Sequence, residues 1–81
     1  MFYKVHLKLN TPVGIFTGFV SGELPSFEEA VSERDHVQEQ LKDLNLGVFT
    51  FFSDVQLGTE ITLTHNMIVS SVFEFTIMDF E

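Results

Sequence analysis

The sequence predicts an α+β domain: a strongly bent, five-stranded antiparallel sheet or open small β-barrel, with one amphipathic helix between the second and third strands. Three observations lead to this prediction. Residues 2–9 (FYKVHLKL) alternate between apolar and polar side chains, which is typical of a half-buried strand. Apolar residues recur at helical spacing from Phe27 onward, and β-rich stretches fill the chain from residue 48. The length fits a single domain, residues 1–81.

The N-terminal block is predicted to form a β-hairpin. Residues 10–14 (NTPVG) supply turn chemistry, because proline fixes φ and glycine tolerates positive φ. The second strand then covers residues 15–20, and Gly18 inside it indicates a bulge or a sharp bend.

The helix is predicted to begin after Ser26. Ser26-Phe27-Glu28-Glu29 resembles a capping box, in which the serine hydroxyl accepts from the Glu29 amide and Glu29 reaches back to the cap amide. Residues 45–47 contain an asparagine and a glycine that suit a left-handed C-terminal residue, so we expect the helix to end there.

The C-terminal block is predicted to supply strands at residues 48–52, 60–64 and 67–77, with a turn around Gly58 and a short break at His65-Asn66. The last strand has apolar residues on both faces. Either the sheet curls so that both faces of this strand are covered, or another chain covers one of them; of the two, we expect the chain to self-associate.

Composition limits the class of protein. Hydrophobic residues make up 44% of the chain, and the ten phenylalanines are expected to form its core. The absence of cysteine excludes disulfides and thiolate chemistry. No apolar run approaches the roughly 20 residues of a membrane helix, and no signal peptide is recognisable. We therefore expect a soluble, cytoplasmic protein that does not associate with membranes.

Motifs of catalysis are missing from the sequence. There is no Gly-rich phosphate loop, Ser-His-Asp set or metal-binding helix motif, and the three histidines lack metal-ligand spacing. We expect a non-enzymatic protein with no catalytic residues, metal ligands or cofactor.

Charge points to two candidate surfaces. The net charge is −8, and seven of the twelve acids lie in or beside the helix. Solubility alone explains an acidic surface; the alternative is an acidic patch that binds a basic protein, with Glu28, Glu29, Glu33 and Asp35 as its candidate residues. Lys4, His6 and Lys8 form the one basic stripe, on a single strand face. They could contact RNA phosphates or an acidic partner, or simply be solvated and balanced by neighbouring acids.

Two segments carry a resemblance to a known family. Residues 5–20 (VHLKLNTPVGIFTGFV) resemble the first two strands of the Sm-like (Lsm/Hfq-type) small β-barrel, with Gly18 where the second strand bends. Residues 61–75 (ITLTHNMIVSSVFEF) resemble its closing strand pair, with His65 near the histidine of the bacterial Tyr-Lys-His motif. The resemblance implies a homo-oligomeric ring in which the fourth strand of one subunit pairs with the fifth of the next, and an RNA-associated or assembly role.

The sequence also departs from that family. The family's helix precedes the first strand, and its Asp-x-x-x-Asn pattern is absent after Gly18. Thr64 replaces the lysine before the family's histidine, and the Arg-Gly of the other branch is missing from residues 68–71. Architecture and assembly therefore carry over better than RNA binding, which is expected to be weak and to use Lys4, His6, Lys8 and His65. Composition also resembles small bacteriophage accessory proteins, so an acidic, protein-binding phage inhibitor is the alternative function.

Overall fold

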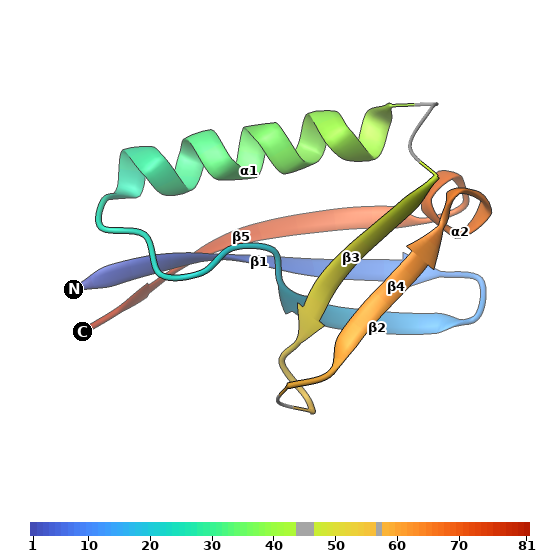
Figure 1. The fold of residues 1–81 in the computed structure, drawn as a ribbon, viewed down its shortest axis with the longest axis horizontal. Coiled ribbons are helices and arrows are strands. Elements are labelled where there is room, and N and C mark those ends of the chain that lie inside the picture. The colour runs from blue at the N-terminus through green and yellow to red at the C-terminus, as the bar shows by residue number, and fades with distance from the viewer. Residues whose placement is uncertain (44–46, 57) are drawn as a thin grey trace.

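The computed structural model describes residues 1–43, 47–56 and 58–81 of the chain. Five antiparallel strands form one open sheet in the order β4-β3-β2-β1-β5, and the long helix lies between the second and third strands in sequence (Figure 1). The elements are β1 (Phe2–Thr11), β2 (Gly14–Phe19), α1 (Phe27–Lys42), β3 (Val48–Ser53), β4 (Glu60–Thr64), α2 (His65–Val69) and β5 (Val72–Phe80). The predicted fold class is confirmed.

The interior strand β1 pairs with a neighbour on each side, β5 and β2. Its partners run from Phe2 opposite Phe80 to Asn10 opposite Val72 on β5, and from His6 opposite Phe19 to Thr11 opposite Gly14 on β2. This pairing brings the two ends of the chain side by side, as Figure 1 shows.

The sheet bends at Gly18, where β3 begins to pair with β2. Only two residue pairs join these strands, Gly18 with Ser53 and Phe19 with Phe52. A Cβ atom at Gly18 would lie 2.0 Å from the Phe52 carbonyl oxygen and 2.8 Å from the Phe51 ring. Glycine is therefore required for the close approach of the two strands, and the predicted bend is confirmed. Beyond this point the β3–β4 hairpin crosses the direction of β1 and β2 (Figure 1).

The helix begins as the sequence predicts. The Ser26 hydroxyl accepts from the backbone N–H of Glu29 at 3.2 Å and caps α1. The Glu29 carboxylate accepts from the same hydroxyl at 3.4 Å, and not from the cap amide as a full capping box requires.

The end of the helix differs from the prediction. α1 ends at Lys42, and the Asp43 N–H donates to the Gln40 carbonyl. Asn45 lies outside the described residues, and Gly47 is not in the left-handed conformation, since the positive-φ residues of the described chain are Gly14 and Gly58.

The core lies between the sheet and α1. Val5, Leu7 and Leu9 of β1 are fully buried on one face of the sheet, which we call the inner face. Leu7 and Leu9 pack in one cluster with residues from the helix, the β3–β4 hairpin and α2, namely Val37, Leu41, Phe49, Phe51, Leu63 and Ile68. The helix thus covers β1 and β5, while the bent hairpin covers the rest of the inner face.

The predicted strand at residues 67–77 is wrong in its first half. Residues His65–Val69 form the short helix α2, and β5 starts only at Val72. The Ser70 hydroxyl donates to the Asn66 carbonyl, and the Ser71 hydroxyl donates to the Met67 carbonyl. These bonds satisfy carbonyls at the helix end, while Ile68 is buried in the core; an extended chain would provide neither.

The expectation that all ten phenylalanines form the core is also wrong. Phe49 and Phe51 are buried, whereas Phe27 and Phe52 are 54% and 56% exposed. The reason is the sheet's two faces: alternation along β3 places Phe51 inside and Phe52 outside.

Candidate functional site

The outer face of the sheet, which points away from α1, carries the predicted basic stripe. Because Val5, Leu7 and Leu9 are buried on the inner face, the alternating residues Lys4 and His6 lie on the outer face. Lys8 continues the stripe. The structure thus brings these three predicted residues together on one strand.

Aromatic rings surround the first cation of the stripe. The Lys4 ammonium lies 5.1 Å from the ring centre of Phe19 and 5.8 Å from that of Phe80. Phe80 in turn stacks on Phe2, with ring centres 5.0 Å apart. No carboxylate of the described chain forms an ion pair with Lys4. Its positive charge is therefore held by ring faces and stays available to an anion.

The middle of the stripe is tied to the loop after β3. His6 Nε2 lies 2.6 Å from Oδ2 of Asp54, and the Thr17 hydroxyl donates to Oδ1 of the same carboxylate at 2.6 Å. The bond from Thr17 and then the nearby His6 lower the pKa of Asp54 below its ordinary value. The cluster therefore consists of one residue each from β1, β2 and the loop after β3. It links the β3–β4 hairpin to β1 and β2.

The end of the stripe is partly neutralised. Lys8 Nζ lies 3.7 Å from a Glu74 oxygen, and the two side chains are 45% and 61% exposed. An exposed pair of this kind is weak, so Lys8 can exchange Glu74 for another anion at little cost.

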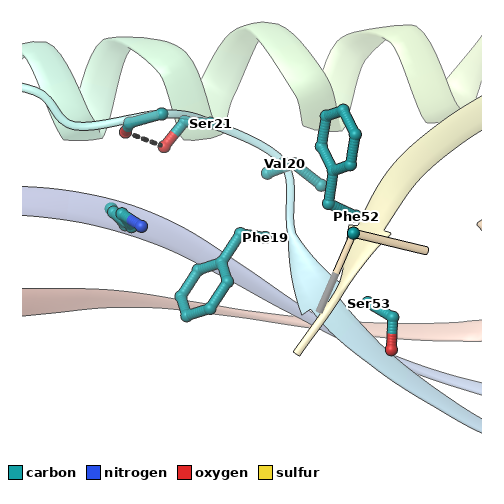
Figure 2. A pocket seen from close by; sticks show the side chains of 8 residues that line it. Phe19, Val20, Ser21, Phe52 and Ser53 are labelled. Atoms are coloured by element: carbon teal, nitrogen blue, oxygen red, sulfur yellow. Dashed lines mark hydrogen bonds between the residues drawn. The ribbon is translucent and has the colours of Figure 1, made fainter. Parts of the chain in front are cut away.

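A groove of about 420 Å³ opens where β2 meets β3. Figure 2 shows the Phe19 and Phe52 rings pointing apart on either side of it, with the Ser21 and Ser53 side chains nearby. Lys4 also lines it, with Val20, Gly22 and Gly58. The Ser21 hydroxyl donates to the Gly22 carbonyl and accepts from the Val5 N–H, and the Ser53 hydroxyl accepts from two loop amides. The groove therefore offers ring faces and one ammonium group to a ligand.

The fourth predicted RNA contact, His65, lies elsewhere. It begins α2, next to the Val48–Thr64 end of the β3–β4 hairpin, whereas the groove is at the opposite end, where Phe52 pairs with Glu60. His65 is therefore not part of the basic stripe on β1.

The predicted acidic residues divide between two sides of α1. Glu29 and Glu33 line a second groove of about 370 Å³, together with Leu24, Ser32 and His36. Glu28 and Asp35 are exposed outside that groove, and Asp35 accepts from the Arg34 guanidinium at 3.2 Å. The helix turns all four acids away from the outer face of the sheet.

Sequence reasoning did not identify Asp54, Thr17 or the aromatic residues around Lys4. Asp54 contacts His6 across 48 residues of chain, and no local pattern signals such a pair. The one available signal is the alternation along β5, which places Phe80 on the other face of the strand from Phe73 and Phe75.

Comparison with known proteins found no matching family model, no matching curated protein and no matching solved structure. The described part of the chain holds no group of three or more His, Asp or Glu side chains that could bind a metal ion. Neither helix in that part is long and apolar enough to cross a membrane.

Proposed function

We propose that this protein is a non-enzymatic, RNA-associated module of the Sm-like type that binds single-stranded RNA weakly on the outer face of its sheet. The observation that carries the proposal is the placement of Lys4 beside aromatic rings, with no ion pair to another described residue. On the outer face the Lys4 ammonium lies over the half-buried rings of Phe19 and Phe80, whereas the predicted acidic patch lies on α1.

The chemistry of the outer face suits single strands. Proteins that bind single-stranded nucleic acid stack bases on aromatic rings and place cations along the backbone. A base stacked on Phe52, which is 56% exposed, would lie in the groove that Lys4 also lines. A phosphate could then reach the Lys4 ammonium, and the next phosphates could follow the stripe toward Lys8.

The net charge of the protein determines how tightly RNA is expected to bind. At −8 the whole protein repels a polyanion, so RNA is expected to bind only at low to moderate salt. An assembled ring or dimer would strengthen binding by presenting several stripes at once. Homo-oligomeric assembly through an outer strand of the sheet, β4 or β5, remains part of the proposal.

The test is fluorescence anisotropy with short labelled oligo(U) and oligo(A) RNA between about 50 and 200 mM salt. We expect the double substitution Lys4→Ala with Lys8→Ala to weaken binding at least tenfold. It should also reduce the salt slope by about 1.4, because each phosphate contact on a single strand contributes about 0.7. Phe52→Ala should weaken binding by about 1–3 kcal/mol through lost stacking.

Lys42→Ala is the matched control for the single substitution Lys4→Ala, because each removes one positive charge and Lys42 lies at the end of α1. An equal loss of RNA affinity in Lys42→Ala and in Lys4→Ala would mean that binding depends only on the net charge of the protein. That result would contradict the proposal. So would a wild-type protein that binds neither RNA at the lowest salt.

A second candidate function is supported by the groove on α1. Glu29, Glu33 and His36 line it beside Leu24, which suits a lysine- or arginine-bearing protein segment. Charge reversal of Glu29 and Glu33 to lysine should abolish binding to a basic partner protein. The same reversal should leave RNA binding unchanged or improve it, so the two candidates predict opposite effects.

A further inference from the structure

The two outer strands of the sheet differ in length and in what they expose. β5 has nine residues and β4 has five. β5 pairs with β1 on one side, and no backbone hydrogen bond of the described residues reaches its other side. Its free edge is about 30 Å long at 3.4 Å per residue.

β5 has few of the features that usually protect a free edge, and its charged residues are Glu74 and Asp79. Its sequence, VFEFTIMDF, contains no proline, lysine or arginine, and its pairing with β1 runs without a bulge. Val72 and Met78 are 66% and 37% exposed on the outer face. Phe73, Phe75 and Ile77 remain half-buried on the inner face. Both faces therefore offer apolar surface beside unpaired backbone groups.

β4 differs in this respect. Its outward residues Glu60, Thr62 and Thr64 are polar and exposed, and its apolar residues Ile61 and Leu63 point inward. Because β4 is short and its exposed residues are polar, it is poorly suited to pairing with another chain. The edge that needs a partner is therefore β5.

We propose that two copies of the chain pair through β5 in antiparallel orientation, about a two-fold axis near Thr76, the middle residue of the strand. The strand is self-complementary in this register. Glu74 lies opposite Met78 of the second copy, and Asp79 lies opposite Phe73, so no two carboxylates face one another. All nine residues take part, whereas pairing of β4 with β5 would use only the five of β4.

The dimer has a continuous ten-stranded sheet. A two-fold axis perpendicular to the sheet keeps both outer faces on the same side. The stripes of the two copies then lie on one surface, separated by the paired β5 strands. The dimer is independent of RNA binding, because it is argued from the strand edge alone.

The first test uses the absence of native cysteine. Thr76→Cys places a single thiol beside the two-fold axis, where directly opposed Cα atoms are about 4.5–5.5 Å apart, within disulfide range. We expect mild oxidation of the RNA-free protein to give a covalent dimer on non-reducing gels. Thr62→Cys, at the middle of β4, is the matched control and should stay uncrosslinked.

The second test uses charge at the same position. Wild type should have the mass of a dimer in light scattering, whereas Thr76→Lys and Thr76→Glu should each be monomeric, because like charges meet at the axis. Mixing the two variants should restore a dimer, and Thr62→Lys should remain dimeric.

A monomeric wild type at all concentrations tested would overturn the proposal. Dissociation by Thr62→Lys, without crosslinking of Thr76→Cys, would also overturn it and would favour head-to-tail pairing of β4 with β5. Since these measurements contain no RNA, their failure is distinct from failure of the RNA proposal.

Discussion

Alternating residues of β1 give the strand one buried, apolar face and one partly exposed, basic face. On the inner face, Leu7 and Leu9 are completely buried against the helix and the hairpin. On the outer face, Lys4 and Lys8 remain partly exposed, with rings or a solvated carboxylate as their neighbours. The inner face therefore provides most of the stability of the strand, and the outer face is free to vary with function.

The largest expected effect comes from adjacent residues on opposite faces. Leu7→Ala should lower the free energy of unfolding by about 2–5 kcal/mol, because it leaves a cavity in a fully buried site. Lys8→Ala should change it by less than about 1 kcal/mol, because its pair with Glu74 is exposed. Urea denaturation of both variants measures the difference. Similar losses of unfolding free energy in the two variants would show that the outer face stabilises the strand as much as the inner face does.

The bend at Gly18 determines how the two faces continue into β3. Gly18→Ala should destabilise the protein by about 1–3 kcal/mol, since its Cβ would overlap the Phe52 carbonyl and the Phe51 ring. Gly22→Ala is the matched control: no atom lies within 4 Å of a Cβ there. Thermal unfolding of both variants is the measurement. Equal melting temperatures would mean that β2 and β3 can separate at little cost.

The smallest expected effect on stability comes from Asp54, which joins the β3–β4 hairpin to His6 and Thr17 on the outer face. Asp54→Asn should cost about 1 kcal/mol at pH 7, because it weakens the bonds to His6 and Thr17. The pKa of Asp54 is lowered in the folded state, so the folded chain binds fewer protons than the unfolded chain near this pKa. The stabilisation is thus complete above the ordinary value of 3.8 and is lost as the pH falls through the folded pKa.

Urea titrations of wild type and Asp54→Asn at pH 7 and near pH 3 check this sign. The difference between the two proteins should shrink at the acidic pH, while Asp35→Asn, on the exposed side of the helix, serves as the control. A difference that is the same at both pH values would show that ionised Asp54 is not what stabilises the link.

Local patterns predicted much of this fold. The alternation of β1 identified the basic stripe and the buried face together, and the Ser26 cap located the start of α1. Prediction failed where a local pattern was ambiguous. Residues 67–71 are apolar enough for a strand, but burial of Ile68 and the back-bonding of two serines made α2 the better structure.

The candidate site was less predictable than the fold. The stripe was found because its members are two residues apart, while Asp54 and Phe52 join it only through the bend at Gly18. The sequence also indicated that the last strand is apolar on both faces, and the Sm-like resemblance implied that it lies at an edge, where the structure places β5.

Periodicity, capping and glycine chemistry are properties of neighbouring residues, and the chain carries them before it folds. Which strands lie at the edges, which rings stay exposed and which carboxylate meets His6 depend on pairings between distant segments. Those pairings minimise the free energy of the whole domain and cannot be read from one segment. The buried face of β1 was therefore predictable from its sequence, whereas the residues beside its outer face were determined by the folded sheet.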